Sequence, residues 1–453
     1  MAQLAKNQEL EVTITDLTYE GLGVAKLDGF PLFIDNALPG EKVLIHITKL
    51  EKKYGFAFTK RILTKSPDRV EAKDRILTQT GIAPLQHLSY AGQLKFKQQQ
   101  VTELYKKQHL DIEVLPTLPS PQTSGYRNKA QVPVRMVKGQ LATGFFKRRS
   151  HTLLPITDFY IQDPEIDRAI LVVRDLLRKY NVPAYDEQRN TGVVRHVMVR
   201  RGYFTHMMMV VIVTRSRQLP HAQEIVAGIN AELPEVAGVM QNINPKRTNV
   251  ILGDHSNTLW GQNYIEDQLL GSTFRISAQS FYQVNPQQTE NLYGKAIDAA
   301  GLTGKETVID AYSGIGTISL TMARHAKHVY GVEIVPSAVA DARVNAQLNG
   351  IGNVTFKLGK AEDVMQQWGE QKLAADVLMV DPPRKGLAPE FIAAVGSMLP
   401  KKVVYVSCNP ATLARDIKAL AEFGYVAKQT QPVDMFPQTL HVESVTALEL
   451  KQD

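Results

Sequence analysis

The feature that most constrains the fold is an alternation of short apolar segments with helical segments, which begins near residue 276. Five apolar runs end at polar loops and predict strands at 307–310, 328–333, 354–358, 376–381 and 403–407. Helical patterns lie between them, at 318–326, 336–348 and 412–423. Such alternation predicts an α/β fold with a doubly wound parallel sheet, in which ligands bind beyond the carboxyl ends of the strands. The loops after these strands should therefore converge on one cleft.

The rest of the chain predicts two further units, because 453 residues exceed what one hydrophobic core usually sustains. Short strands and Gly/Pro turns in residues 1–62 predict a small OB-like β-barrel. Residues 63–272 predict a mixed α+β central domain, with a long helix at 90–108 and strands at 129–137, 193–201 and 207–213. The α/β domain would then span 273–453, and the segment near 90–118 could pack against it.

The charge of the chain is compatible with a nucleic-acid partner. Its net charge of +7 fits a polyanionic ligand, although cationic surfaces also serve solubility. The segment 49–61 mixes lysines with Tyr54, Phe56 and Phe58, which either meet phosphates and bases or face the barrel core. No run approaches the ~20 apolar residues of a membrane span, and the N-terminus has no signal-peptide pattern, so we expect a cytoplasmic protein without membrane contact.

A glycine-rich loop after the first strand of the α/β region is a candidate cofactor site. Gly314 and Gly316 let the backbone approach a ligand, and Glu333, at the end of the next strand, can accept both ribose hydroxyls of an adenosine. A nicotinamide dinucleotide is the alternative. However, Ser319 stands where its third glycine would be, and Asp310 opens the loop with a carboxylate that suits the cation of S-adenosylmethionine. The pattern favours S-adenosylmethionine.

Cys408 is the only cysteine, which excludes an internal disulfide and any cluster held by several thiolates. A lone cysteine is usually a small buried hydrophobe, but this one ends a strand at the predicted cleft. A thiolate there could add to carbon 6 of uracil and make carbon 5 nucleophilic. The candidate base for the later proton removal is Glu443, with His441 as the second choice. In the turn Asp-Pro-Pro-Arg384, the arginine replaces the aromatic residue of amino-methylating enzymes and disfavours, without excluding, that reaction.

These motifs together resemble the RNA (uracil-5-)-methyltransferases, and among them the bacterial enzymes that act on 23S ribosomal RNA. The resemblance covers nearly the whole chain and is most specific in Asp381-Pro-Pro-Arg-Lys-Gly, Ser407-Cys-Asn-Pro-Ala-Thr-Leu-Ala-Arg-Asp416 and His441-Val-Glu443. It implies a TRAM domain at 1–62, Cys408 as nucleophile and Glu443 as general base. It implies cofactor contacts at Gln283, Tyr312, Glu333 and Asp381, which join Asp310, Gly314 and Gly316. Substrate contacts are expected at Asp381, Arg384, Phe281, Arg127 and Lys129.

One departure from this family concerns its iron–sulfur cluster. Many relatives hold the cluster with four cysteines, whereas here the corresponding stretch reads Thr80-Gly-Ile-Ala-Pro-Leu-Gln-His87 and Phe159 stands near the fourth position. We therefore expect no iron–sulfur cluster and no metal. The loss bears on the central fold and on target choice, and it leaves the proposed chemistry intact.

The expected activity is methylation of carbon 5 of one uridine, or two, in 23S ribosomal RNA, without an obligate protein partner. A transfer-RNA uridine methyltransferase is the first alternative, which the barrel disfavours because transfer-RNA enzymes of this superfamily generally lack a TRAM domain. A non-catalytic RNA-binding protein of ribosome assembly is the second alternative. It would be expected to lack Cys408 or Glu443, and both are present.

Overall fold

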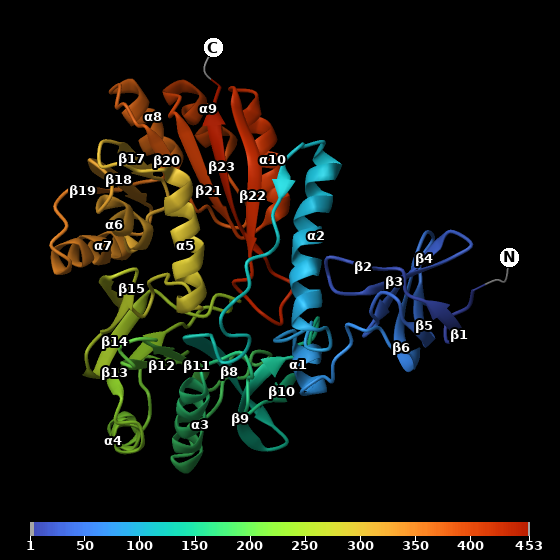
Figure 1. Ribbon diagram of the computed structural model, residues 1–453. Coiled ribbons are helices and arrows are strands. Elements are labelled where there is room, and N and C mark those ends of the chain that lie inside the picture. Colours follow the sequence, from blue (N-terminus) through green and yellow to red (C-terminus); the bar gives the residue numbers. More distant parts are fainter. Residues whose placement is uncertain (1–3, 452–453) are drawn as a thin grey trace.

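The computed structural model describes residues 4–451 as three groups of strands and the helices around them. Figure 1 shows a small barrel beside the long helix α2, a central sheet, and a C-terminal α/β layer on the far side of that sheet from helices α3 and α4. No helix among the described residues is long and apolar enough to cross a membrane.

The N-terminal barrel has its own hydrophobic core. Its strands are β1 (Glu9–Thr13), β2 (Asp16–Leu17), β3 (Gly23–Leu27), β4 (Phe30–Asp35), β5 (Lys42–Leu50) and β6 (Gly55–Thr64), in the order β1-β5-β6-β4-β3-β2. Alternate residues such as Leu32, Ile34 and Ile45 point inward and are fully buried, as a half-solvated sheet requires. The barrel predicted for residues 1–62 is thus present, and β6 runs two residues further.

None of the three aromatic residues of segment 49–61 belongs to the barrel core. Tyr54 and Phe58 are 38% and 41% exposed, whereas Phe56 is only partly exposed. The rings of Tyr54 and Phe56 each lie 5.8 Å from the ring of Phe33 on β4. Phe33, Tyr54 and Phe56 therefore form an aromatic cluster on the barrel surface, and the exposed Phe58 packs separately against His46.

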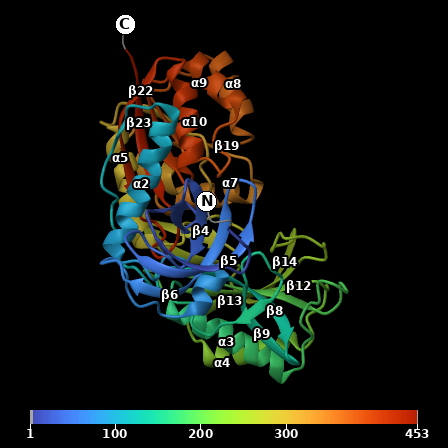
Figure 2. The same cartoon turned by 90° about the vertical axis from the view of Figure 1, so that its right-hand side faces the viewer.

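The central region is a seven-stranded sheet with helices on one face. Its strands are β8 (Lys129–Val137), β9 (Gln140–Phe146), β10 (Leu153–Pro155), β11 (Val194–Arg201), β12 (Met208–Thr214), β13 (Val236–Ile243) and β14 (His255–Gly261), in the order β10-β9-β8-β11-β12-β13-β14. The helices α1 (Arg75–Thr80), α3 (Pro164–Lys179) and α4 (Ala222–Glu232) share the core beneath this sheet. Figure 2 shows α3 and α4 below the strands, at the opposite end of the molecule from the C-terminal helices.

The C-terminal region confirms the predicted α/β fold. The order of its sheet is β19-β18-β17-β20-β21-β23-β22-β7, with parallel pairing from β19 to β21 and an antiparallel β23. These strands are β7 (Glu113–Val114), β17 (Thr307–Asp310), β18 (His328–Glu333), β19 (Val354–Leu358), β20 (Val377–Val380), β21 (Lys402–Ser407), β22 (Tyr425–Val433) and β23 (Glu443–Leu450). The helices on its two faces are α5 (Pro286–Ala300), α6 (Thr317–Ala323), α7 (Pro336–Leu348), α8 (Ala361–Glu370), α9 (Pro389–Met398) and α10 (Pro410–Ala421). The five predicted strands lie within one residue of the observed ones.

The helix α2 (Tyr90–Gln108) and strand β7 group with the C-terminal sheet. Strand β7 pairs with β22, and the hydroxyl of Tyr105 lies 2.8 Å from that of Thr430. The ammonium group of Lys97 donates to Asp434 at 2.5 Å, and both side chains are fully buried. The stretch 90–118 is therefore part of the C-terminal body in three dimensions, although it precedes the central sheet in sequence.

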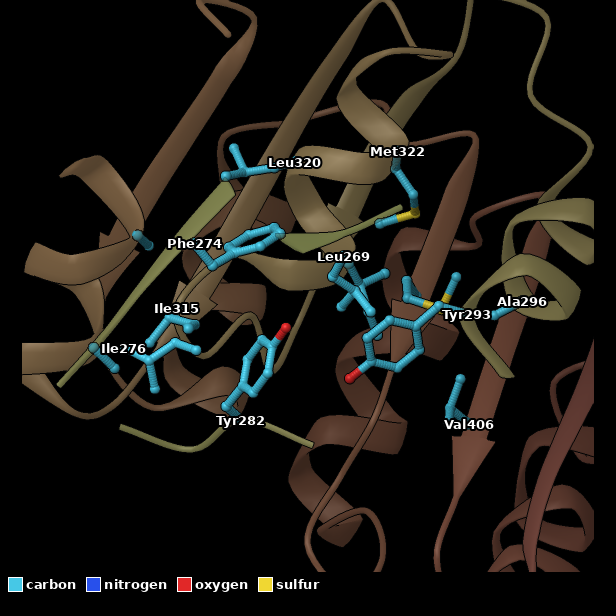
Figure 3. Packing of buried hydrophobic residues seen from close by; sticks show 14 of the residues in the cluster. Leu269, Phe274, Ile276, Tyr282, Tyr293, Ala296, Ile315, Leu320, Met322 and Val406 are labelled. Carbon is cyan, nitrogen blue, oxygen red and sulfur yellow. The ribbon is translucent and has the colours of Figure 1, made fainter. Parts of the chain in front are cut away.

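The hairpin of β15 (Tyr264–Leu269) and β16 (Ser272–Ser277) joins the central and C-terminal sheets. Figure 3 shows Phe274 near Leu320 and Ile276 near Ile315, and the same cluster reaches central-sheet methionines. A boundary at 272/273 would divide this hairpin. We propose a boundary before β15, and we keep 1–62 as the barrel.

Candidate active site

The glycine loop lies between β17 and α6 and has the backbone that its glycines permit. Gly314 and Gly316 have φ values of 54° and 88°, in the left-handed region where side chains are strained. A Cβ on Gly316 would lie 3.0 Å from the ring of Phe356, so the loop is also closely packed. Glu333, at the end of β18, accepts the backbone N–H of Gly314 at 3.1 Å and that of Val335 at 2.7 Å. This carboxylate is thereby held at the edge of the loop.

Asp310 lies beneath the loop and is fully buried. One carboxyl oxygen accepts the hydroxyl of Ser319 at 2.5 Å, and the other has no side-chain hydrogen-bond partner within residues 4–451. Burial raises the pKa of Asp310 to about 6. An acidic group with a free oxygen under a glycine loop fits the cationic end of S-adenosylmethionine. Ser319, which the sequence presented only as a missing glycine, holds this carboxyl in place.

Two more of the predicted cofactor residues lie at the same end of the sheet. The ring of Tyr312 packs 5.8 Å from that of Phe391. The buried Gln283 accepts the side-chain amide of Asn128 at its backbone oxygen, 3.3 Å away. The side chain of Gln283 also lies within hydrogen-bond reach of the hydroxyl of Tyr293. Residues of α5 and of the loop before it therefore meet the glycine loop.

Cys408 and Glu443 are brought together by strand register. β21 and β23 are antiparallel neighbours, and their last paired residues are Ser407 and Ser444. One step further along this register, Cys408 stands opposite Glu443. Asp381 directly follows β20, the other neighbour of β21. The thiol and two carboxyl groups therefore gather at one edge of the sheet, as the sequence predicted for loops that follow adjacent strands.

This cluster is acidic, and burial raises the pKa of each of its groups. Burial raises the pKa of Asp381 to about 7, with a further rise from Asp310. Burial, and then Asp381, raises the pKa of Glu443 well above its usual range. Burial and the charges of Glu443 and Asp381 raise the pKa of Cys408 to about 11, and the Arg384 guanidinium opposes this. Strongly shifted groups in a cleft are typical of catalytic sites.

Cys408 lines a cavity of about 1190 Å³, here called the cysteine cavity. Its walls come from the barrel, from α2 and from the C-terminal loops, and they include Arg384 and His441. Burial, and then Arg384, lowers the pKa of His441 to about 4, so this histidine is neutral near pH 7. Tyr19 of the barrel also lines the cavity and is 73% exposed.

The remaining predicted substrate residues lie at two places. Arg127 and Lys129 line an adjoining cavity of about 430 Å³, here called the middle cavity. Burial lowers the pKa of Lys129 to about 7, with further contributions from Arg200 and Arg127. Phe281 is 65% exposed and belongs to the lining of neither cavity. The structure therefore brings Arg127 and Lys129 beside the cysteine cavity but leaves Phe281 outside both.

Two residues of this site escaped the sequence analysis. Tyr293 is buried with its hydroxyl near Thr317 and Gln283 and close to the charges of Asp381 and Glu443. It lies in an apolar stripe of α5, a pattern that indicates core. Tyr19 lies in a turn of the barrel, and nothing in the sequence connects it with Cys408. Among residues 4–451, no group of three or more His, Cys, Asp or Glu side chains could hold a metal ion.

Comparisons with known proteins agree on one family, the RNA methyltransferases. The family described as tRNA (Uracil-5-)-methyltransferase matches residues 256–451, and the TRAM domain matches residues 3–58. An RNA methyltransferase of Lactiplantibacillus plantarum is 61% identical, over 99% of this chain and 98% of the relative. One of Enterococcus faecalis is 53% identical, over 98% of this chain and 97% of the relative.

A solved structure resembles nearly the whole chain. It is the Pyrococcus abyssi tRNA (uracil-54, C5)-methyltransferase in complex with S-adenosyl-L-homocysteine. The TM-score is 0.78 at 25% identity, and the match covers 97% of this chain and 99% of that chain. A match of this extent includes the barrel region. The expectation that a barrel separates ribosomal-RNA from transfer-RNA enzymes therefore fails for this archaeal protein.

Proposed function

Because the chain belongs to the S-adenosylmethionine-dependent RNA (uracil-5-)-methyltransferases, we propose that it methylates carbon 5 of a uridine in 23S ribosomal RNA through a transient bond to Cys408. The observation that carries this proposal is the strand register that sets the only thiol opposite the buried Glu443. S-adenosylmethionine supplies an electrophilic methyl group when it is bound. The protein has to make carbon 5 of the uracil nucleophilic enough to accept it.

The thiol of Cys408 and the carboxyl of Glu443 act in different steps of this reaction. The sulfur of Cys408 donates an electron pair to carbon 6, and the electrons of the C5–C6 double bond move onto carbon 5 and the O4 carbonyl. After carbon 5 has accepted the methyl group, Glu443 takes its remaining proton. The electrons of that C–H bond restore the double bond, and the C6–S bond breaks with its electron pair returning to Cys408.

The charges of the site suit these steps. A thiol with a pKa of about 11 is protonated in the free protein, so addition to the ring requires a proton acceptor. Asp381, with a pKa of about 7, is partly ionised near neutral pH and can take that proton. Glu443 must lose its own proton before it can take the one on carbon 5, and its raised pKa makes the resulting carboxylate a stronger base. Arg384 is the cation that lowers the pKa of Cys408 and of Glu443, so it favours the negative charge that each group must carry.

Cofactor binding is assigned to the glycine loop and its neighbours. The carboxylate of Glu333 would hold the ribose hydroxyls, and Asp310 would face the amino group. Tyr312, Gln283 and Asp381 would complete the site. The free carboxyl oxygen of Asp310 and the left-handed glycines of the loop support this assignment.

A transfer-RNA uridine is the second candidate target. The observation that favours it is the similarity over 97% of the chain to a transfer-RNA enzyme. The motif resemblance to bacterial 23S enzymes favours ribosomal RNA, and one or two uridines could be modified.

One experiment tests the target and the mechanism together. The protein is incubated with unmodified 23S ribosomal RNA or unmodified transfer RNA and methyl-labelled cofactor, and 5-methyluridine is mapped. We expect label in ribosomal RNA and none with Cys408→Ala. Glu443→Gln should accumulate a denaturation-resistant protein–RNA adduct, because elimination stalls. Label only in transfer RNA would select the second target, and an active Cys408→Ala would overturn the covalent mechanism. Adduct accumulation with His441→Gln instead would exchange the assigned bases.

A further inference from the structure

A separate hollow of about 340 Å³ lies on the central sheet, on the face away from α3 and α4. Strand β8 shows which face this is. Its residues Val132 and Val134 pack in the core with α3 and α4, whereas Gln131, Pro133 and Arg135 line the hollow. The side chains of a strand alternate between faces, so the hollow belongs to the face opposite the helices.

This arginine hollow combines cations with aromatic rings. Three arginines, Arg135, Arg195 and Arg247, line it with Glu187 as the only acidic side chain. The guanidinium of Arg135 lies 5.4 Å from the ring centroid of Phe146, and that of Arg195 lies 4.7 Å from the centroid of Tyr185. The ring of Phe146 is partly exposed, whereas that of Tyr185 is buried beside the guanidinium of Arg195. A cation beside an accessible ring is the combination that binds unpaired nucleotides, with cations on phosphates and rings on bases.

A β-bulge brings Arg195 into the hollow. The register of β11 with β12 shifts between Val194 and His196, so that the adjacent Arg195 and His196 both line the cavity. Both side chains are more than nine-tenths buried. The Nε of Arg195 and the Nδ1 of His196 have no hydrogen-bond partner in the described part of the chain. Buried polar atoms without partners are uncommon and indicate a ligand or water.

The middle cavity is the neighbour of both the arginine hollow and the cysteine cavity. The arginine hollow and the middle cavity share the lining residues Gln131, Phe145 and Ile251. The middle cavity in turn shares Leu440 and His441 with the cysteine cavity. Arg127 and Lys129 line this middle cavity, which borders both the cysteine cavity and the hollow.

We propose that the arginine hollow binds one unpaired nucleotide of the same RNA strand whose uridine enters the cysteine cavity. The volume is at the lower end of small-ligand pockets and suits one nucleotide. A base within a duplex is stacked on both faces, so only an unpaired base can lie against the partly exposed ring of Phe146. The inference rests on the proposed function for the identity of the strand, and it adds a second contact that selects single-stranded RNA.

The test measures binding without turnover. Fluorescence anisotropy gives the Kd of the full-length protein for a labelled single-stranded RNA of about twelve nucleotides, and for the same RNA in a duplex. Phe146→Leu removes the ring and keeps an apolar side chain, whereas Phe146→Tyr keeps the ring. Arg247→Gln removes an exposed cation from the rim. The matched controls are Phe204→Leu and Arg217→Gln, which lie outside the three cavities.

We expect Phe146→Leu to raise the single-strand Kd about fivefold or more, which is the loss of one base–aromatic stack. Phe146→Tyr should bind like the wild type, Arg247→Gln should weaken binding about threefold or more, and duplex binding should not change. Equal Kd values for the wild type, Phe146→Leu and Arg247→Gln would overturn the inference, as would equal losses in the controls. Since no methylation is needed, a protein that binds as expected but does not methylate would contradict the proposed function alone.

Discussion

Cys408 lies at the end of a strand, and the buried groups around it set its pKa. The groups that raise its pKa are buried with it, and Arg384 is the cation that lowers it. A thiol with a pKa of about 11 is mostly protonated near pH 7, so we expect it to react slowly in the free protein. Such a site protects the single thiol from side reactions.

The first prediction concerns the thiol pKa. Because the charge of Glu443 raises the pKa of Cys408, Glu443→Gln should lower it and make alkylation by iodoacetamide faster near pH 8. Arg384→Met should slow the same reaction. The rate, measured by mass spectrometry from about pH 7 to about pH 9, should rise throughout in the wild type, since this range lies below a pKa of about 11.

Glu449→Gln is the control for this measurement. Glu449 lies on the same strand β23, with its side chain 60% exposed, and its loss should leave alkylation unchanged. A wild-type rate that levels off below pH 8 would refute the raised thiol pKa.

The second prediction concerns Asp310. If its ionised carboxylate binds the cofactor's amino group, affinity for S-adenosylmethionine should be full above a pKa of about 6 and fall as the pH drops below it. Ser319→Ala removes the hydrogen bond that lowers this pKa, so the fall should begin at higher pH. Titration calorimetry at several pH values measures this, with Thr321→Ser on the same helix as control. An unchanged pH profile in Ser319→Ala would exclude this role for Asp310.

A functional residue can be predicted from the sequence when it belongs to a specific motif. A residue that matters only because of where the fold places it cannot. Cys408 and Glu443 stand out because their neighbours form specific motifs. Tyr293 does not, because a tyrosine in an apolar stripe indicates core packing. Phe281 was expected at the substrate, but its ring is largely exposed outside both cavities.

Among the elements, α2 is fastened to the C-terminal body by a buried charge. Lys97 meets Asp434 at 2.5 Å with both side chains at zero exposure, and Lys97 also donates to the backbone oxygen of Phe436 at 3.0 Å. Removal of one partner from a buried pair leaves an uncompensated charge, which costs more than the pair contributes.

The third prediction follows from this pair. Lys97→Met should lower the free energy of unfolding by about 3–5 kcal/mol, and Lys97→Met with Asp434→Asn should recover part of the loss. Urea denaturation followed by circular dichroism measures both. Lys106→Met, on the same helix in an exposed pair with Glu103, should change stability by less than about 1 kcal/mol. A double variant less stable than Lys97→Met would show that the charges are not coupled.

The positions where the family resemblance would place cluster cysteines form an apolar core. Phe159 is fully buried, its ring lies 5.4 Å from that of Phe145, and it shares a core with Leu77, Ile82 and Ala83. The segment where relatives hold three cysteines thus packs on the residue that stands in place of the fourth. Side chains of this kind stabilise by burial, which needs no metal.

Element positions were predicted well where periodicity and caps agree. Helix α2 begins and ends at the predicted residues, with Ser89 as its N-cap. Helix α10 begins two residues earlier than predicted, because Asn409 caps it and Pro410 occupies its first turn. Strand β7 was not predicted, since two residues carry no periodic pattern.

For the whole molecule, the barrel forms one wall of the cysteine cavity. Tyr19, with 73% of its side chain exposed, stands on that wall, far from Cys408 in sequence. An exposed ring beside the target site can stack on a neighbouring base.

The fourth prediction tests this arrangement. Tyr19→Ala should lower kcat/KM for the RNA about tenfold, and Tyr19→Phe should restore it, because stacking needs only the ring. Methyl-transfer kinetics with labelled cofactor give these values. Tyr54→Ala, on the barrel but outside the cavity, should have the smaller effect. A larger loss with Tyr54→Ala would assign RNA contact to the outer barrel surface instead.

The arrangement of the three units relative to one another could not be predicted from the sequence. Their folds follow from periodicity within each segment, but the contacts between them come from single side chains far apart in the chain. The buried Glu41–Arg69 pair and the contact of Leu38 with Leu85 fix the barrel, and neither forms a pattern that sequence reading detects.

The loop between β22 and β23 touches both halves of the molecule at once. Its Gln438 accepts the amide of Leu85 and bonds to Gln93 on α2, and Pro437 accepts the hydroxyl of Tyr126. With the strand β7 and the β15–β16 hairpin, the chain crosses between the lobes repeatedly. Contacts repeated across the two lobes oppose a hinge motion between them. We therefore expect the RNA, and not the protein, to change conformation when a uridine enters the cysteine cavity.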